Sequence, residues 1–489
     1  MEEKNSESQI HFEKYSKNIK HYNEFMYNLF SEISKPKFSV FKETKLTKDQ
    51  LLQNMQSNIK DLVDFIYQLN DITDKEIYKC LSCIFGAFLG DAIGGYCEFK
   101  GPDPKNMNKI FVGNPIFGDS PGQVTDDSEM AMSCAYAIME NLEFDNLNSD
   151  FFFYFYGLWH ISKPKDEGIT TKKALKNFKP SDFNPEKKNN FEKIFQNIKQ
   201  KNSKSLANGF LMRTSPFIVW CYFRYKDIII ETFNKSNNSE ELFKLFLKIK
   251  DQANKDDICT HPNDSLSIAH SIFVIMSLGA ICELKPHQIL NNIEILLNNE
   301  FFIHKEFIDI YQMIKEELDF YKNDKNKSFI NNSFRYFTSG TKNVNTHMGF
   351  YYHAFRLTLY YLFYFDEIKE DNNFTKYRTI MNQICNLGGD TDTNAAIVGT
   401  VIGPLLGYKN FGDTDFKKMV MLIPKKRFIF SPALMIIYVY FLKDNINNNG
   451  TMNMNFLKMI ISILFDKIDV NNLSNIFSKF ELKKNDKKK

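Results

Sequence analysis

Three glycines spaced four residues apart constrain the fold of this chain more than any other feature of its sequence. Gly86, Gly90 and Gly94 share one face of a helix, because residues four apart lie one above the other on the helix surface. Each glycine costs a helix roughly 1 kcal/mol relative to alanine, so the row indicates that another helix approaches this face closely. The alanine- and glycine-rich stretch 395–403 repeats the device. We therefore expect tightly packed central helices with the chemistry at their ends.

The rest of the chain also predicts helices. Residues 1–75 carry apolar side chains at helical spacing, such as Tyr22, Phe25, Met26 and Leu29. We find no internal repeat and no sustained period-two alternation of the kind that strands show. The sequence therefore predicts an all-α protein, with a compact multi-helix domain and helical extensions at both ends.

Two kinds of composition alternate after about residue 77. Segments with more glycine and alanine and long uncharged stretches recur at 208–218, 266–281 and 388–407. Segments rich in asparagine and lysine lie between them, at 183–204, 234–258 and 322–345. Because such a polar composition buries little apolar surface, we interpret the second kind as insertions in loops.

Charge and cysteine content exclude several classes of protein. Lysine and arginine total 62 against 59 acidic residues, a net charge of +3, so we expect no basic face for sequence-specific nucleic acid. The basic end 482–489 is interpreted as a solvated terminus. Eight cysteines in 489 residues make no disulfide framework. Cys80 and Cys83 lack further zinc ligands nearby and are expected to share a buried helix.

The sequence also predicts where the protein works. The charged N-terminus differs from a secretory signal. The longest apolar run, 428–442, contains Ser431 and Pro432 and is shorter than the ~20 residues that a membrane-spanning helix needs. We interpret it as a core helix, and we expect a soluble, cytoplasmic protein with no membrane partner.

The first of two acidic motifs lies at residues 124–132. Thr125 suits a helix N-cap, and Asp126 and Asp127, which follow it, suit the positive end of a helix. Helix capping alone explains such a pattern equally well. The motif therefore marks a helix start with two adjacent carboxylates.

The second acidic motif follows a pair of glycines. Gly388 and Gly389 free the backbone for a tight turn, and Asp390 and Asp392 come directly after it. Carboxylates at alternate positions of a turn can converge on one point, as they do in calcium loops. Capping is again the simpler alternative when this motif is taken alone.

Together the two motifs predict a metal site. Ligands that are all oxygen, with no cysteine or histidine among them, suit hard cations such as Mg²⁺ or Mn²⁺. Four aspartates at one site would repel each other and raise each other's pKa unless a cation neutralised them. Two divalent ions match four carboxylates in charge, and such a pair can orient a substrate oxygen and a water.

Five ordered segments between about residues 77 and 408 resemble the ADP-ribosylglycohydrolases, the family of the dinitrogenase reductase-activating glycohydrolase and the vertebrate ADP-ribosyl-acceptor hydrolases. The segments are 86–98, 121–130, 208–213, 260–262 and 388–393. The resemblance implies an all-α fold with two Mg²⁺ ions, or Mn²⁺ in their place, at the base of a cleft. The metal ligands that it implies are Thr125, Asp126, Asp127, Asp390, Asp392 and Thr393.

The resemblance also implies roles for residues around the metals. Glu98 matches a glutamate that approaches metals and substrate, and it is the first candidate for the acid or base, with Asp127 and Asp166 as the next candidates. Substrate-binding residues are expected at Gly168, Asn208 and Gly209. Glu167 stands where the family commonly has an apolar residue.

Two further residues of the matching segments have competing interpretations. Arg213 lies in the block near the cleft and can equally be a structural ion-pair partner. His261 precedes a proline, and a His-Pro pair more often shapes a helix start, so we expect a structural role. Backbone N–H groups at the helix starts after Thr125 and Asp392 are candidates to accept pyrophosphate oxygens.

The implied activity is hydrolysis of the bond between ADP-ribose and a modified protein side chain. The partner is then an ADP-ribosylated protein or a small molecule that contains ADP-ribose; the acceptor linkage and the oligomeric state stay open. The alternatives are a two-metal nucleotide phosphohydrolase and a non-catalytic ADP-ribose-binding or crystallin-like structural protein. We expect an accessory helical extension over 1–75, a catalytic domain with polar insertions over 76–410, and a helical extension with a basic tail over 411–489.

Overall fold

The computed structural model describes residue 53 and most of residues 74–447. The stretches that it leaves out within this range are 105–112, 115, 142–145, 181–187, 236–238, 304–307, 324–332, 371, 412 and 423–426. The predicted extension over 1–75 therefore lies almost wholly outside the described residues, as does the basic tail after residue 447.

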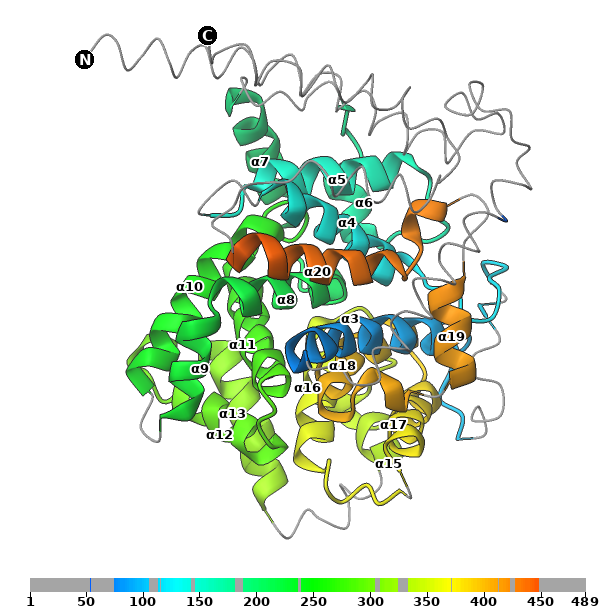
Figure 1. Ribbon diagram of the computed structural model, residues 1–489, viewed down its shortest axis with the longest axis vertical. Helices are drawn as coiled ribbons and strands as arrows, with labels where there is room; N and C mark the ends of the chain where they lie inside the picture. Colours follow the sequence, from blue (N-terminus) through cyan, green and yellow to red (C-terminus); the bar gives the residue numbers. More distant parts are fainter. Residues whose placement is uncertain are drawn as a thin grey trace.

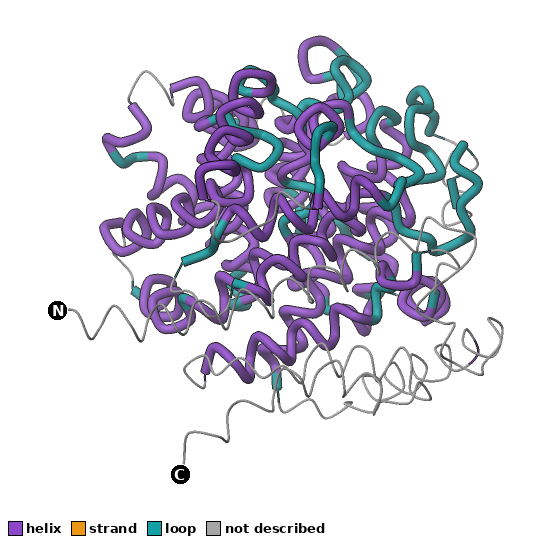
Figure 2. Tube along the Cα trace, turned by 90° about the horizontal axis from the view of Figure 1, so that it is seen from above, coloured by secondary structure: helices purple, strands orange, loops and turns teal. Residues whose placement is uncertain are grey.

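The described part of the chain is all-α, which confirms the predicted fold class (Figure 2). The α-helices are α3 (Lys75–Gly94), α4 (Asp126–Glu140), α5 (Ser149–Ile161), α6 (Ile169–Leu175), α7 (Lys188–Asn202), α8 (Ser215–Arg224), α9 (Lys226–Asn234), α10 (Ser239–Asp257), α11 (Asp264–Ile281), α12 (Pro286–Leu297), α13 (Ile308–Lys322), α15 (Ser333–Phe337), α16 (Tyr351–Phe363), α17 (Asn373–Leu387), α18 (Thr391–Leu406), α19 (Asp413–Met421) and α20 (Leu434–Asn447). Short 3₁₀ turns are η5 (Asn208–Phe210), η6 (Glu300–Ile303), η8 (Gly340–Lys342), η9 (Tyr408–Asn410) and η10 (Phe428–Phe430).

The glycine row of α3 packs against the alanine- and glycine-rich helix α18, as the sequence predicts. A Cβ at Gly86 would lie 2.3 Å from the carbonyl oxygen of Gly399, and a Cβ at Gly94 would lie 2.4 Å from that of Thr391. The end of α3 therefore meets the start of α18, so the two helices are antiparallel. This pair makes the most extensive helix contact in the described fold and lies at its centre (Figure 1).

Other helices enclose this central pair. α16 and α17 pack on α18, α11 touches both members of the pair, and α4, α8, α19 and α20 cover α3. The apolar run expected to be a core helix forms η10 and α20, and α20 lies across α8 in Figure 1. The buried side chains form one continuous hydrophobic core.

Two of the three polar segments are helices, so their interpretation as loop insertions is wrong. Residues 188–202 form α7 and residues 239–257 form α10. In α10 the apolar side chains recur at helical spacing, and Leu242, Leu245 and Ile249 are fully buried. A helix at the protein surface needs only one apolar face, so most of its residues can be polar. The many lysines and asparagines of this segment therefore masked its narrow apolar stripe in the sequence. The described part of 322–345 contains α15 and η8.

Two helices have the length and apolar composition that would cross a membrane, α3 and α11, but 89% of each apolar window is buried inside the fold. Neighbouring helices cover both, which identifies them as core helices. Cys80 and Cys83 are buried within α3, as expected from their spacing.

We predict that Gly90→Ala destabilises the protein strongly. The new Cβ would lie 2.3 Å from the Ala395 carbonyl oxygen, a backbone atom that can move only if the two helices separate. Such overpacking costs about 1–3 kcal/mol, and denaturant unfolding measures it. Gly95→Ala is the matched control, because Gly95 has φ −55° and its Cβ would meet nothing closer than 3.6 Å. Equal stability of the two variants would contradict the close contact.

Candidate functional site

The acidic motifs meet where α3 ends and where α4 and α18 begin. Asp126 opens α4, with Asp127 next to it, and Asp390 is the N-cap of α18, two residues before Asp392. Glu98 lies in the turn that follows α3. Because α3 and α18 are antiparallel, the end of one helix and the start of the other bring these carboxylates to one side of the core.

The glycine pair before α18 makes the predicted tight turn. Gly388 and Gly389 have φ of +71° and +80°, values that other residues rarely adopt. The turn is tied to the segment after Glu98, because Phe99 N donates to Gly389 O at 2.8 Å and Gly389 N donates to Lys100 O at 3.1 Å. These bonds fix Glu98 relative to Asp390.

Thr125 occupies the predicted N-cap position of α4, but its hydroxyl does not cap the helix. The hydroxyl lies 3.1 Å from Asp127 Oδ2 and 3.4 Å from Asp392 Oδ2. It therefore links the carboxylates of α4 and α18, although Thr125 and Asp392 lie 267 residues apart in the chain.

Asp91 of α3 supplies the missing cap, a role that the sequence did not reveal. Its carboxylate accepts hydrogen bonds from Thr125 N at 3.0 Å, from Ser128 N at 3.2 Å and from Ser128 Oγ at 2.5 Å. Asp91 is fully buried between the glycines of the row. A single carboxylate in an apolar helix forms no motif, so the sequence offered no signal for this role.

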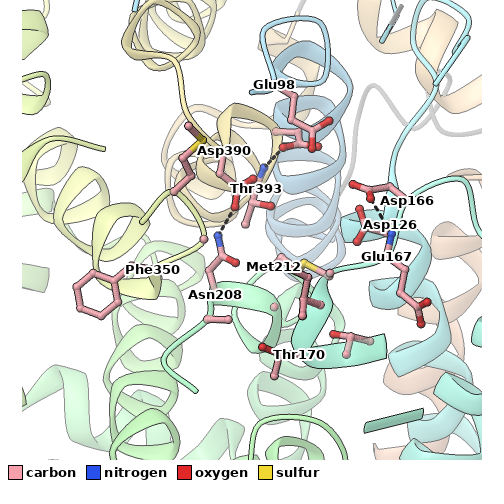
Figure 3. Close-up of a pocket in the computed structure, with 18 of the residues that line it drawn as sticks. Glu98, Asp126, Asp166, Glu167, Thr170, Asn208, Met212, Phe350, Asp390 and Thr393 are labelled. Atoms are coloured by element: carbon pink, nitrogen blue, oxygen red, sulfur yellow. Dashed lines mark hydrogen bonds between the residues drawn. The ribbon is translucent and has the colours of Figure 1, made fainter. Parts of the chain in front are cut away.

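A cleft of about 830 Å³ opens above these residues, which is a size that suits a small-molecule ligand. The carboxylates of Glu98, Asp126, Asp166 and Asp390 all point toward it (Figure 3). The other predicted residues in its lining are Gly168, Asn208, Gly209, Asp392 and Thr393. Thr125 and Asp127 are buried beside this lining, where the Thr125 hydroxyl contacts both Asp127 and Asp392. The structure thus brings every predicted site residue to the cleft or to its floor.

The carboxylates raise each other's pKa, and burial is the larger cause. The pKa values of Asp126, Asp127 and Asp392 lie well above the usual range for aspartate. Burial, followed by repulsion from Asp390 and Asp166, raises the pKa of Glu98 to about 9. Bringing these groups to full ionisation therefore requires a compensating positive charge.

The arrangement of oxygen atoms fits cations. Two groups of three carboxylates have ligand atoms within 4.8 Å of one another, and Asp392 belongs to both: Asp91, Asp127 and Asp392 in one, and Glu98, Asp390 and Asp392 in the other. Asp127 Oδ1 is buried without a hydrogen-bond partner, whereas both oxygens of Asp91 already accept hydrogen bonds. The described lining of the cleft contains no lysine or arginine. Asp127 therefore offers a free ligand oxygen, and Asp91 is a supporting residue.

Amides orient two of the carboxylates. Asn208 Nδ2 donates to Asp390 Oδ2 at 2.7 Å, and Asn114 Nδ2 donates to Glu98 Oε2 at 2.7 Å. Asn114 is buried and was not predicted from the sequence. It lies in the loop before α4, outside the matching segments, and a lone asparagine forms no motif, so only the folded chain identifies it.

Asp166 and Glu167 diverge at the cleft wall. The Asp166 carboxylate lies beside that of Asp126 in Figure 3 and accepts a hydrogen bond from Glu167 N at 2.8 Å. The Glu167 carboxylate contacts His160 Nδ1 at 2.5 Å. A histidine partner explains how an acidic side chain is accommodated where related proteins commonly have an apolar one.

A small antiparallel bridge between Ala207 and Phe350 forms one cleft wall. Asn208 N donates to Gly349 O at 2.9 Å, and Tyr351 N donates to Leu206 O at 3.0 Å. The bridge holds the segment before η5 against the segment before α16. It therefore sets the position of the Asn208 amide over Asp390.

Arg213 and His261 lie behind this wall, and only one of them reaches the cleft. Arg213 is fully buried and pairs with Asp256 at 3.1 Å, which is the structural alternative considered for it. His261 is buried with Nδ1 2.8 Å from Thr260 Oγ1, but its ring also lines the cleft and its Nε2 has no hydrogen-bond partner. His261 thus lies in the cleft wall, and the structural role expected for it stays a prediction.

Comparisons with known proteins give three matches. Residues 73–415 match the model of the ADP-ribosylglycohydrolase family. A curated relative named "Putative ADP-ribosyl glycohydrolase L543", from Acanthamoeba polyphaga mimivirus, is 27% identical over 337 residues, which are 67% of this chain and 86% of the relative. A solved structure named "ADP-ribosylglycohydrolase-related protein complex" covers 76% of this chain and 99% of its own, with 17% identity and a TM-score of 0.46.

We predict that the metal-free protein loses stability as the pH rises. Because the pKa of Glu98 is raised to about 9 and that of Asp91 to about 6, the folded state binds more protons than the unfolded chain. The stability that these two groups contribute is fully present below the unfolded carboxyl pKa of about 4 and is lost as the pH rises toward 9.

Thermal unfolding in chelator between pH 5 and pH 9 measures this loss, and added Mg²⁺ should reduce it. Asp392→Asn is the matched control, because it removes one of the repelling charges and should flatten the pH dependence. A melting temperature that rises steadily with pH in chelator would contradict the prediction.

Proposed function

The chain belongs to the ADP-ribosylglycohydrolase family, and on that premise we propose that it is a Mg²⁺-dependent hydrolase that releases ADP-ribose from modified protein side chains. The family acts on substrates that contain ADP-ribose and is known for a divalent metal site. One observation carries the proposal for this chain. Aspartates from α4 and α18 converge with Glu98 on the floor of one cleft whose described lining holds no lysine or arginine.

The residues that would hold two Mg²⁺ ions are Thr125, Asp126, Asp127, Asp390, Asp392 and Thr393. Two ions bring four positive charges to a site whose four aspartates are buried together. When bound, such ions neutralise the carboxylates and polarise the oxygen atoms of a sugar or a water. The buried, unpartnered Oδ1 of Asp127 and the sharing of Asp392 by both carboxylate groups support this fit.

Glu98 is our first candidate for the acid or base. Its carboxylate points into the cleft, is only 2% exposed, and has one oxygen held by Asn114. A carboxyl group kept from water and fixed in orientation is suited to exchange a proton with the leaving side chain or with the attacking water. Asp166, across the cleft beside Asp126, is the second candidate. Asp127 is buried beside the cleft lining and fits a metal ligand better than a proton carrier.

Backbone and amide groups are available to bind the rest of the ligand. Gly168 has open space where a side chain would project, so a ligand can reach its backbone. Gly209 lies against His261, where a Cβ would come within 2.9 Å of the ring. Gly168, Asn208 and Gly209 form a wall of the cleft, and we place the ADP-ribose against it. The start of α4 or of α18 offers backbone N–H groups for its phosphates.

Release of free ADP-ribose tests the proposal directly. The protein is incubated with Mg²⁺ and with proteins ADP-ribosylated on arginine or on serine, and the products are identified by mass spectrometry. We expect ADP-ribose and an unmodified acceptor side chain. AMP or phosphate as the released product would instead identify a nucleotide phosphohydrolase, and binding of ADP-ribose without turnover would identify a non-catalytic protein.

Asp126→Ala, Asp390→Ala and Asp392→Ala are the matched variants for that experiment. Each removes one expected metal ligand, so we expect hydrolysis to fall at least 100-fold while circular dichroism shows a folded protein. Near-normal turnover by any of them at limiting Mg²⁺ would contradict the metal assignment.

We predict that Glu98→Gln separates chemistry from binding. The amide keeps the shape of the side chain but loses its capacity to exchange a proton, so turnover should fall by about 100-fold or more. ADP-ribose affinity, measured by calorimetry, should change only modestly. Asp166→Asn is measured alongside it, and the carboxylate whose loss slows single-turnover hydrolysis more is the acid or base. Unchanged turnover in Glu98→Gln would assign Glu98 to structure.

A further inference from the structure

A buried ion pair joins the segment before α20 to the helix that carries Asp126 and Asp127. The Arg427 guanidinium binds Glu129 of α4 with both arms of its fork, Nε to Oε1 at 2.5 Å and Nη2 to Oε2 at 2.6 Å. Both side chains are more than nine-tenths buried. Such a bidentate pair fixes distance and orientation together.

Two further hydrogen bonds fix the position of the Glu129 and Arg427 side chains. Trp159 Nε1 of α5 donates to Glu129 Oε2 at 2.9 Å, and Arg427 Nη1 donates to Ser162 O at 3.1 Å. Close by, Tyr136 Oη of α4 donates to Ile429 O at 2.5 Å. The start of α4 is thus bonded on two sides, to α5 and to the segment that begins at Arg427.

Arg427 lies outside the part of the chain that matches the family, which ends at residue 415. Glu129 lies three residues after Asp126 in α4, so the two side chains share one face of the helix's first turn. This turn is held by Arg427 through the Glu129 carboxylate and by Asp91 of α3 through Ser128 N. The guanidinium of Arg427, from beyond the matching region, therefore reaches the first turn of the helix that carries Asp126 and Asp127.

We propose that Arg427 is a positioning residue for the metal centre: by clamping Glu129, it sets the rotation of the first turn of α4 and so the placement of Asp126 and Asp127. This inference rests on the metal site proposed above. The clamp and Trp159 Nε1 together hold the Glu129 carboxylate in one orientation. Residues 427–447 are then part of the working site rather than an appendage to it.

Charge and position predict opposite results for one substitution, which makes the inference testable. Arg427→Gln adds one net negative charge near the site, and charge alone would tighten the binding of a divalent cation. Loss of the clamp would instead weaken binding, on the order of 10-fold, as substitutions that support metal ligands commonly do. The sign of the change therefore separates the two effects.

The experiment measures Mn²⁺ binding to the full-length protein by calorimetry and by electron paramagnetic resonance, without substrate, at a temperature where each variant is folded. We expect Arg427→Gln to bind Mn²⁺ about 10-fold more weakly than the unmodified protein. The double variant Arg427→Gln with Glu129→Gln restores the net charge but not the clamp, so it should bind Mn²⁺ as weakly. Arg427→Lys keeps the positive charge but cannot form the two-point contact of the guanidinium. Its Mn²⁺ affinity replaces that of Arg427→Gln if the latter variant does not fold.

Tyr438→Phe is the matched control. Tyr438 of α20 donates a buried hydrogen bond to Pro216 O at 2.8 Å, so its loss weakens the same C-terminal segment without touching Glu129. This variant should melt earlier and keep its Mn²⁺ affinity. Unchanged or tighter Mn²⁺ binding by the Arg427 variants overturns the inference alone, whereas no Mn²⁺ binding by the unmodified protein overturns the metal centre as well.

Discussion

Close contact between the backbones of α3 and α18 is the constraint on which the rest of the structure depends. A side chain at Gly86 or Gly90 would collide with a carbonyl group of the partner helix, so only glycine permits this separation. Dispersion contacts between closely packed backbones, and the water that they exclude, offset what the glycines cost the helix. Because the two helices are antiparallel, the same contact sets the turn that carries Glu98 beside the turn that carries Asp390. The acidic site thus lies at the end of the closely packed pair of α3 and α18.

Acidic side chains gather at the end of that contact, and neighbouring groups fix the orientation of their carboxylates. Glu98, Asp126, Asp390 and Asp392 are buried at the cleft, and each would raise the pKa of its neighbours without a cation. Three supporting groups decide which oxygens remain for ligands: Asp91 caps α4, Asn114 holds Glu98, and Asn208 holds Asp390. The site is therefore built as two layers, with the outer layer fixing the orientation of the inner one.

Two buried arginines join helices behind the cleft through ion pairs. Arg213 pairs with Asp256 and stacks on Tyr156, which joins the start of α8 to the end of α10, while Arg427 joins the segment before α20 to α4. A buried ion pair contributes little net stability, because desolvation offsets most of the attraction. Its contribution is geometric: breaking it leaves an uncompensated charge, so the native arrangement is strongly preferred over close alternatives.

The sequence by itself determined the class of fold, the central glycine-lined contact and the two acidic motifs, since helical periodicity, glycine spacing and adjacent carboxylates are local patterns. It misjudged α10, whose single apolar stripe is diluted by lysine and asparagine, and it missed Asp91 and Asn114, because a lone carboxylate or amide carries no pattern. Only the tertiary structure decided which carboxylates face one another, that Arg213 pairs with Asp256, and that Arg427 reaches Glu129 across 298 residues of chain. Those relations depend on how helices pack, and packing joins residues whose separation along the chain leaves no mark in the sequence.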